Sequence, residues 1–509
     1  MIAAVSMARR FIGFQEGFDR FFTIKNITAR RYYKGLFLKF PLKTQKFVFT
    51  RRIGSQGWES FIDSRKIINL PGNFCVIISP CFNPLFYDMS RKTTLENGLR
   101  IVTKELDNTK SVTVLILVGA GSRYEVKSIN GISHFLEHMF FKGAKKYKNT
   151  KEVSEAIDGV GGDFNAFTGK EYAGYYVKVA DRHFDLAVDV LADMLIHSKF
   201  DPVEIDKERG VIMEEYNMYQ DTPMYQIGWD FERLIYGDQP IGWDQVGTKE
   251  IIMGLKQADF LKYRQELYTP ENTVIAIAGN VDHDKVVEQI EKLFEFEKNK
   301  KAYDFLPVEK FSTDKKLYLR NKKTEQAHVM VGFPGYSEEH KDHYAAKLLS
   351  IVLGGNMSSR MFLSVREAQG LAYYISSTTD EYTDTGTFTT NAGVSLDGID
   401  KAIVAIMQEY KKVLDEPVPA AELKKAQEFL KGKMVLRLED SEEYAHLIGK
   451  YELLYAKMRS PEEIMKAIDK VAVKDLQRVA QDLFKAEKAR LGVIGPYEDE
   501  ERFLKLLKF

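Results

Sequence analysis

The fold of this chain is decided by Gly131-Ile-Ser-His-Phe-Leu-Glu-His-Met-Phe-Phe-Lys-Gly143, a stretch that contains an H-x-x-E-H cluster. His134 and His138 are four residues apart, so on a helix both rings project from one face and can bind a single metal ion. Glu137 lies beside them, close enough to act as general base on a water bound to that metal. The order inverts the commoner H-E-x-x-H motif and is typical of zinc hydrolases. The alternative is a helix whose two histidines are purely structural.

The composition is that of an ordinary globular chain, long enough for two to four domains. The 509 residues are 44% hydrophobic and 29% charged, with no net charge. This balance hides an asymmetry, because residues 1–88 carry 14 Lys and Arg against 5 Asp and Glu. Both cysteines, Cys75 and Cys81, also lie in that segment. Any zinc site in residues 89–509 is therefore restricted to histidine and carboxylate ligands.

Residues 1–88 are predicted to be a basic, phenylalanine-rich extension, either disordered or preceding the true start of the protein. An orderly pattern begins at Met89, where Asn97-Gly98 between alternating apolar residues indicates a hairpin. The segment has no apolar run long enough to cross a membrane, and its charges follow its short apolar start, unlike those of a secretory signal. Residues 1–52 are arginine-rich and acid-poor like a transit peptide, but they have little serine and much phenylalanine.

The body of the chain alternates strands and helices in a plan that occurs twice. The strand at 111–119 and the strand and helix at 273–294 correspond to 325–333 and 491–508. We therefore predict an α+β protein of two homologous α/β-sandwich domains, each with an antiparallel-rich sheet flanked by helices. The expected parts are an N-terminal zinc domain at 89–300, a linker at 301–316 and a C-terminal domain without the zinc motif at 317–509.

A third protein ligand is needed if zinc is to keep one position open for water. The helix expected at about 202–220 offers one, because two carboxylates fall on its otherwise apolar inward stripe: Ile205, Glu208, Ile212, Glu215 and Tyr219. Burying a carboxylate is costly unless a metal or a cation compensates it. We predict Glu215 as the ligand and Glu208 as a carboxylate that orients a ligand histidine. The alternative is that both are surface glutamates on a badly phased helix.

Residues 91–509 resemble the pitrilysin/insulinase family of inverzincin peptidases, which includes the mitochondrial processing peptidases, and most closely its two-domain bacterial members. Two motifs are the H-F-L-E-H helix and Glu208-Arg-Gly-Val-Ile-Met-Glu-Glu215, whose last position is the distal zinc glutamate of the family. A third, Gly161-Gly-Asp-Phe-Asn-Ala-Phe-Thr168, is similar to the edge strand that binds substrate by β-augmentation near Asn165 and Ala166. The alternative without the family context is a hairpin that begins with glycine.

The fourth motif lies in the second copy, where Leu353–Phe362 leads into Val365–Tyr373. The resemblance implies that Arg366 and Tyr373 reach the zinc site from the other half and stabilise the substrate carbonyl as oxyanion donors do. By themselves, an arginine on a helix and a tyrosine on a strand are more often structural. Position 433, which aligns with Glu215, is lysine, so this copy lacks the metal chemistry.

The resemblance implies a zinc metalloendopeptidase with one Zn²⁺ per chain that cleaves peptides or unfolded protein segments. Chains of this kind pair, so we expect a homodimer or a pair with an inactive homologous chain. A non-catalytic assembly subunit and a metal-dependent hydrolase of a non-peptide substrate stay open as alternatives. We expect a cytoplasmic bacterial protein that binds neither nucleic acid nor membrane. A second histidine cluster, Glu338 to His343, is better explained as a solvated helix start.

Overall fold

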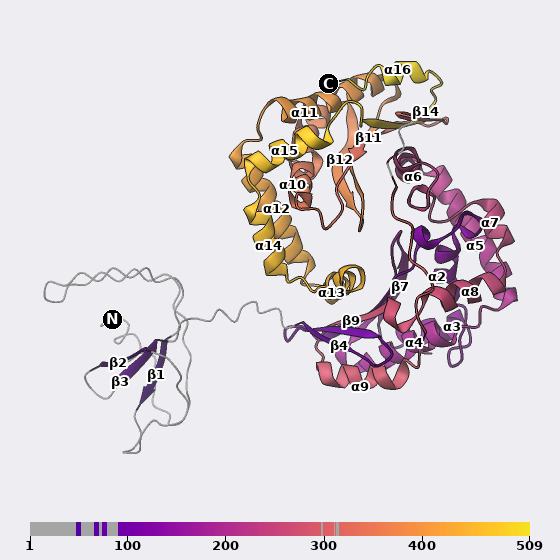
Figure 1. Ribbon diagram of the computed structural model, residues 1–509, viewed down its shortest axis with the longest axis vertical. Helices are drawn as coiled ribbons and strands as arrows, with labels where there is room; N and C mark the ends of the chain where they lie inside the picture. The colour runs from indigo at the N-terminus through magenta and orange to yellow at the C-terminus, as the bar shows by residue number, and fades with distance from the viewer. Residues whose placement is uncertain are drawn as a thin grey trace. The chain divides into compact units, whose positions relative to one another are not determined.

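The computed structural model describes residues 90–508 except 297–298, 310 and 312–314, together with three strands near the N-terminus. The chain divides into two units, Met1–Tyr87 and Asp88–Phe509 (Figure 1). In the first unit β1 (Phe47–Arg51), β3 (Phe74–Ile78) and β2 (Lys66–Leu70) form an antiparallel sheet in that order. The remainder of the predicted extension, and with it the question of the start, lies outside the described residues.

The first sheet of the second unit has six strands, in the order β4-β5-β9-β6-β8-β7. Their bounds are β4 (Arg91–Thr94), β5 (Arg100–Glu105), β9 (Thr273–Gly279), β6 (Ser111–Val118), β8 (Ala173–Ala180) and β7 (Asp163–Thr168). The pair β5–β9 is parallel and the other neighbours are antiparallel. The predicted hairpin joins β4 to β5, and Gly98 takes the φ of +93° that its turn requires.

The second sheet repeats this order with five strands, β10-β14-β11-β13-β12. Their bounds are β10 (Leu317–Asn321), β14 (Arg490–Gly495), β11 (Ala327–Pro334), β13 (Gly386–Val394) and β12 (Ala372–Glu381). Its single parallel pair, β10–β14, corresponds to β5–β9, and β12 corresponds to β7 as the edge strand. The predicted α+β class is confirmed, and each copy of the plan forms a sheet of the same topology.

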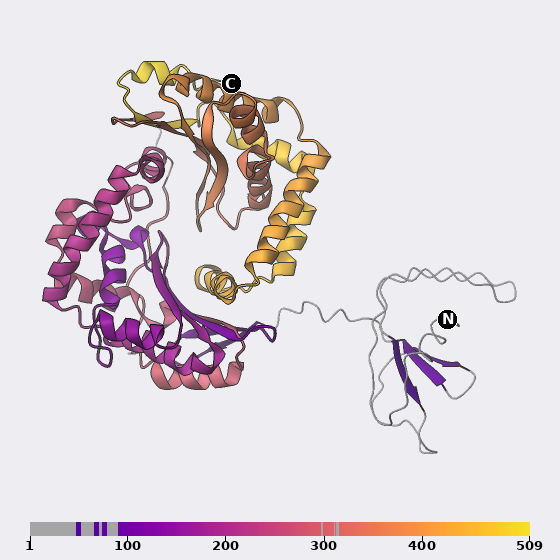
Figure 2. The ribbon, with the colours of Figure 1, turned by 180° about the vertical axis from the view of Figure 1, so that it is seen from behind.

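Helices cover each sheet (Figure 1, and from behind in Figure 2). The first core includes side chains from α2 (Ile132–Phe140), α3 (Thr150–Asp158), α4 (Phe184–His197), α5 (Pro202–Asp221), α7 (Lys249–Gly254), α8 (Gln257–Leu267) and α9 (His283–Leu293). The second includes side chains from α10 (His343–Gly354), α11 (Ile399–Asp415), α12 (Ala420–Arg437), α14 (Pro461–Lys470), α15 (Val473–Leu483) and α16 (Glu500–Leu504). Within the described residues, no helix is long and apolar enough to span a membrane.

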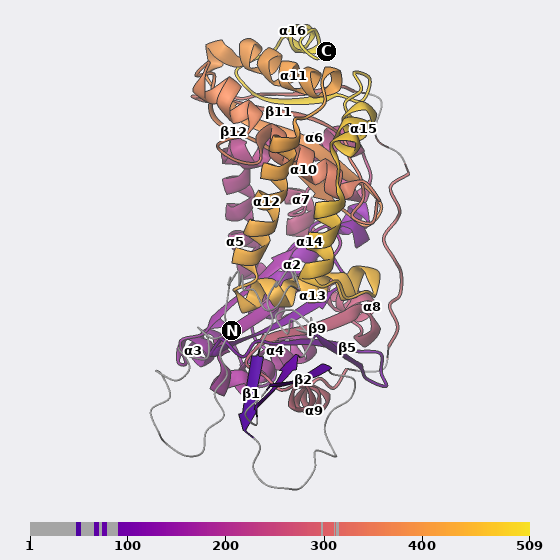
Figure 3. The same ribbon diagram turned by 90° about the vertical axis from the view of Figure 1, so that its left-hand side faces the viewer.

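Two helices cross from one half to the other. Helix α6 (Pro223–Tyr236) places Ile227 and Phe231 against the second sheet, where they pack with Ile494. Helix α13 (Ser441–Tyr455) places Ile448 and its neighbours against the central strands β6 and β9 of the first sheet (Figure 3). Each fully buried apolar side chain contributes ~1.5–3 kcal/mol, so the exchange couples the two halves strongly. One helix that precedes the predicted linker at residues 301–316 therefore packs on the second sheet, and one helix that follows it packs on the first sheet.

Candidate metal centre

Helix α2 carries the H-x-x-E-H cluster and is fixed at its N-terminus by a buried carboxylate. Glu125 accepts hydrogen bonds from the backbone N–H groups of Gly131 (2.7 Å) and Ser133 (2.9 Å) and from the Asn130 side chain (2.8 Å). An anion here satisfies unpaired N–H groups and interacts favourably with the helix dipole. Burial raises the pKa of Glu125, against the opposing effect of these hydrogen bonds. The spacing of the sequence does not reveal this role of Glu125, because the contact depends on a turn outside the helix.

The residue before α2, Gly131, lies where the backbone leaves no space for a side chain. Gly131 has a φ of +94°, and a Cβ there would lie 2.3 Å from the carbonyl oxygen of Val246. The helix then buries an apolar stripe at helical spacing, which consists of Ile132, Phe135, Leu136, Met139 and Phe140. The opposite face carries the two histidines and Glu137, all half-buried. The packing of the apolar stripe therefore determines which way the metal-binding face points.

Helix α5 supplies the carboxylates in the phase that its sequence predicts. It begins after Asp201, whose side chain accepts a 2.8 Å hydrogen bond from the N–H of Val203. Glu208 is buried between the apolar residues of the inward stripe, and Glu215 is half-buried on the same stripe. Glu214, one position earlier, is exposed. The surface-glutamate alternative is therefore wrong for Glu208, and Glu215 faces α2.

Three side chains meet at the centre of the cluster: His134, His138 and Glu215. Glu215 Oε2 lies 3.4 Å from His134 Nε2 and 3.4 Å from His138 Nε2. These distances exceed the ~2.7–3.2 Å of a good N–H···O hydrogen bond. Ligand atoms ~2.0–2.2 Å from a tetrahedral zinc ion lie about 3.3–3.6 Å from one another, so the donor set fits zinc. Among the described residues this is the one group of three or more possible ligands with such spacing.

A chain of charged contacts supports His138 from behind. Glu208 Oε1 accepts a 2.9 Å hydrogen bond from His138 Nδ1, and Glu208 Oε2 lies 2.5 Å from the ammonium of Lys142. A carboxylate on Nδ1 leaves Nε2 free to face a metal and fixes the ring orientation. The contact of Glu208 with a ligand histidine expected from the sequence is therefore present. The contact of Lys142 with Glu208 was not predicted, although Lys142 is four residues after His138. The corresponding atom of the other ring, His134 Nδ1, is buried and has no hydrogen-bond partner among the described residues.

The carboxylates dominate the electrostatics of the cluster. Burial lowers the pKa of His138, but the hydrogen bond with Glu208 and the nearby carboxylate of Glu215 outweigh it and raise that pKa to about 9. The two imidazoles, His134 first, hold the pKa of Glu215 well below its usual range. Burial raises the pKa of Glu208, but His138 and Lys142 outweigh it and lower that pKa overall. The surrounding carboxylates thus favour the protonated form of His138 when no metal displaces the proton.

Strand β7 borders the cluster as the edge of the first sheet. It pairs with β8 alone among the described strands, so its second edge is open for a further strand. The N–H of Ala166 does not bond to β8 but donates to the side chain of its neighbour Asn165 (2.9 Å). At the end of the strand, the Thr168 hydroxyl donates a 2.5 Å hydrogen bond to Glu137 Oε2. Thr168 is the last residue of the motif at 161–168, but we predicted no role for it from the sequence.

Arg366 and Tyr373 lie apart from the metal cluster. Neither forms a hydrogen bond or an ion pair with it in the described part of the chain. The Arg366 guanidinium lies 4.5 Å from the Phe362 ring centre, and Tyr373 is 74% exposed. Tyr373 is also the extra residue of a β-bulge, since Ala372 pairs with Val394 and the next paired residue is Tyr374. Bulges re-aim side chains, so this one presents the tyrosine to the surroundings of the chain.

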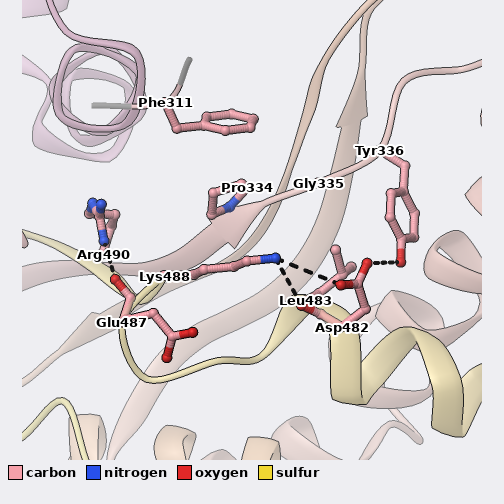
Figure 4. Close-up of a pocket in the computed structure, with 9 residues that line it drawn as sticks. All are labelled: Phe311, Pro334, Gly335, Tyr336, Asp482, Leu483, Glu487, Lys488 and Arg490. Carbon is pink, nitrogen blue, oxygen red and sulfur yellow. Dashed lines mark hydrogen bonds and ion pairs between the residues drawn. The ribbon is translucent and has the colours of Figure 1, made fainter. Parts of the chain in front are cut away.

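Two other places in the second half do not join this site. His340 stacks on Tyr336 with ring centres 4.0 Å apart, and His343 Nδ1 lies 3.6 Å from Glu381. Glu338 and His343 are both buried, so the prediction of a solvated helix start is wrong, and the cluster has protein partners. A cavity of about 490 Å³ lies among the nine residues of Figure 4: Phe311, Pro334, Gly335, Tyr336, Asp482, Leu483, Glu487, Lys488 and Arg490. None of the predicted site residues lines it.

Comparison with known proteins agrees with these features. Residues 100–231 match the family described as insulinase, peptidase family M16, and residues 254–430 match the peptidase M16 inactive domain. The crystal structure of a protease from Helicobacter pylori has a TM-score of 0.75 at 26% identity, covering 81% of this chain and 100% of that one. The peptidase M16 inactive domain from Pseudomonas fluorescens shares the fold, with a TM-score of 0.74 at 16% identity, covering 81% and 99%. The class is therefore a two-domain peptidase fold of mixed helices and sheets.

Sequence relatives are nearer still. The uncharacterized zinc protease YmxG of Bacillus subtilis is 38% identical over 408 residues, which are 80% of this chain and 98% of the relative. An uncharacterized zinc protease of Streptomyces coelicolor is 37% identical over 417 residues, covering 81% and 90%. The chain belongs to the insulinase family, peptidase family M16. The predicted family is thereby confirmed, and the names of the relatives support a zinc-dependent peptidase in general terms.

Proposed function

We propose that the protein is a zinc-dependent endopeptidase that hydrolyses peptides or unfolded protein segments. Family membership supports a zinc peptidase of some kind. The observation that carries the finer proposal is the position of Glu215 Oε2, at 3.4 Å from the Nε2 atoms of both His134 and His138. Three ligands of this kind leave a tetrahedral zinc ion one open position, as catalytic sites require.

In this proposal His134, His138 and Glu215 hold one Zn²⁺ per chain. When bound, zinc supplies a Lewis acid that acidifies water and polarises a scissile carbonyl. Glu208 keeps the proton of His138 on Nδ1, and Lys142 neutralises the buried charge of Glu208. The ring of His138 is thereby oriented before any metal or substrate arrives.

Glu137 is the general base of the proposed reaction. Its carboxylate lies on the same face of α2 as the ligand rings and has one oxygen bonded to Thr168. It takes a proton from the attacking water and returns it to the leaving amine. Positioned acid–base groups of this kind contribute ~10²–10⁴-fold to a rate.

The substrate is proposed to add as a strand to the open edge of β7, near Asn165 and Ala166. The Ala166 N–H, which β8 leaves unused, would then donate to a carbonyl of the peptide instead of to the Asn165 side chain. Such pairing uses main-chain groups that every extended peptide has. It therefore favours unfolded segments over folded proteins and imposes little sequence preference.

Arg366 and Tyr373 are proposed to complete the site of a second chain, either an identical one or an inactive homologue. This proposal is supported by the exposure of Tyr373 on its bulge and by the match of this half to an inactive peptidase domain. Both side chains can donate hydrogen bonds to a developing oxyanion. The cytoplasmic location expected from the sequence also stays a proposal.

The test is to measure zinc content and cleavage of an unstructured peptide by the purified chain. We expect Glu137→Gln to keep one zinc per chain and lose cleavage, and Glu215→Gln to lose both. Glu214→Gln is the matched control, since Glu214 is an exposed neighbour on the same helix, and it should keep both. Zinc occupancy without any peptide turnover by the unaltered chain would favour a non-peptide hydrolase. Absence of bound zinc would favour a non-catalytic subunit.

A further inference from the structure

Thr168 connects the proposed substrate strand to the proposed general base. It is the last residue of β7, where its backbone is held by pairing with Ala173 on β8. Its carbonyl also accepts a 3.4 Å hydrogen bond from the side chain of Gln245. The backbone of Thr168 is therefore fixed by the sheet on one side and by a loop on the other, and its side chain starts from a defined position.

The Thr168 hydroxyl has one proton and two acceptors within reach. Glu137 Oε2 is 2.5 Å away and the carbonyl oxygen of Ser133 is 3.5 Å away. A short hydrogen bond to a carboxylate is about twice as strong as one between neutral groups, so the proton lies on the Glu137 side. The other carboxylate oxygen, Glu137 Oε1, has no hydrogen bond with any of the described residues. Thr168 thus occupies one oxygen of the base and leaves the other for water.

The hydrogen bond from Thr168 fixes the conformation of the Glu137 side chain, which helix α2 alone does not. A glutamate side chain loses up to ~2 kcal/mol of conformational free energy when its rotamers are frozen. The half-buried Glu137 has no other hydrogen-bonded anchor in the described residues, whereas its neighbour His138 is fixed through Glu208. Without Thr168 the carboxylate would sample several rotamers around the cluster. Misplacement of a reacting group by about 1 Å can cost ~10²-fold in rate.

We propose that Thr168 is a positioning residue for Glu137, so that strand β7 holds substrate and general base in one rigid frame. The inference rests on the function proposed above and adds a residue with no role in metal binding. A peptide added to β7 and the Glu137 carboxylate on α2 would then both be positioned by this strand, the carboxylate through its hydrogen bond with Thr168. Thr168 acts through Glu137 and touches neither metal nor substrate in this arrangement.

The experiment compares Thr168→Val, which removes the hydroxyl at nearly constant volume, with Thr168→Ser, which keeps it. We expect Thr168→Val to lower kcat for an unstructured peptide by about 10-fold to 100-fold, with KM within about twofold and zinc content unchanged. Thr168→Ser should keep kcat within about threefold of the unaltered protein. A crystal structure of Thr168→Val should show the Glu137 carboxylate displaced from its present rotamer. Thr93→Val is the matched control, because it removes a hydrogen-bonded hydroxyl at the opposite edge of the same sheet, and it should leave kcat unchanged.

The inference is overturned if Thr168→Val keeps the kcat of the unaltered protein, or if Thr168→Ser loses as much activity as Thr168→Val. A rise in KM with constant kcat overturns it as well, since Thr168 would then act on substrate binding alone. Loss of zinc from Thr168→Val would assign the residue to the metal site instead. These results differ from failure of the proposed function, in which the unaltered protein itself binds zinc and cleaves no peptide.

Discussion

The two halves of the chain share one topology, but their corresponding helices α2 and α10 differ in how polar and how deeply buried they are. Helix α2 contacts α5 and β7, and α10 contacts α12 and β12 in the same manner. On α2 one face is polar and half-buried, whereas α10 buries ten of its twelve residues. Where Glu208 is buried on α5, the aligned residue of α12 is the buried Ala426. The half without ligands therefore fills the same space with apolar packing.

This comparison shows what a metal site demands of its fold. Buried polar groups cost free energy unless each has a partner. The first half provides these partners one by one: Glu125 for the helix start, Lys142 for Glu208 and Thr168 for Glu137. In the second half Lys433, aligned with Glu215, is exposed and lies over the ring of Phe429 on its own helix. A single fold can thus hold a reactive cluster or an ordinary core, depending on a few positions of two helices.

The largest effect is expected when Glu215 of the first half is replaced by lysine, the residue at the aligned position 433 of the second half. We expect Glu215→Lys to abolish zinc binding and to lower peptide cleavage by more than about 10³-fold, because an ammonium replaces the anionic ligand beside two imidazoles. Zinc content and kcat measured together test this. The reciprocal change Lys433→Glu should leave zinc content and stability unaltered, since α10, which corresponds to α2, has no H-x-x-E-H cluster. A variant Glu215→Lys that retains zinc would show that Glu215 is not a ligand.

The exchanged helices offer a second comparison, between α6 and α13. Ile227 and Ile448 are both essentially inaccessible, each in the core of the other half's sheet. We expect Ile227→Ala and Ile448→Ala each to lower the free energy of unfolding by about 2–4 kcal/mol. Because each helix stabilises the opposite half, residues 90–508 should unfold in one transition by urea, followed by fluorescence and circular dichroism. Two separate transitions, each shifted by only one of the variants, would contradict this coupling.

Periodicity determines which residues share a face, and that part of the structure could be predicted from the sequence. The inward phase of Glu208 and Glu215 on α5 and the repeated plan of strands follow from spacing. Periodicity does not say which element a face will meet. The exchange of α6 and α13, the bond from Thr168 to Glu137 and the Glu125 anchor therefore appear only in three dimensions. The roles of Arg366 and Tyr373 stay predictions, since they require a second chain.

Glu208 allows a milder exchange between the halves. We expect Glu208→Ala, the residue found in α12, to weaken zinc binding by about 10-fold to 100-fold, because His138 Nδ1 loses the acceptor that orients the ring. Competition with a chelator measures the affinity directly. Glu204→Gln, earlier on the same helix and paired only with the exposed Lys207, is the control and should bind zinc normally. Unchanged affinity in Glu208→Ala would show that ring orientation is set by packing alone.

The smallest expected effect concerns the polar contacts of the two crossing helices. Helix α6 forms an ion pair between Asp230 and Arg320. Helix α13 forms ion pairs through Glu452 and also a 3.1 Å hydrogen bond between His446 Nε2 and the Tyr172 hydroxyl. Burial, assisted by Lys450, lowers the pKa of His446 to about 4. The unfolded chain, with a pKa near ~6.5 at this histidine, therefore takes up the proton at higher pH than the folded chain. The contribution of neutral His446 to the free energy of unfolding is therefore complete above the unfolded pKa of ~6.5. It is lost as the pH falls from there towards the folded pKa of about 4.

We expect the free energy of unfolding to fall by about 1–2 kcal/mol more between pH 7 and pH 5 in the unaltered protein than in His446→Gln. Glutamine keeps a hydrogen-bonding group near Tyr172 but cannot take up the proton. Urea unfolding at several pH values measures both slopes. Equal slopes would mean that the protonation state of His446 is the same in the folded and the unfolded protein, so that acid does not weaken the docking of α13 at this position.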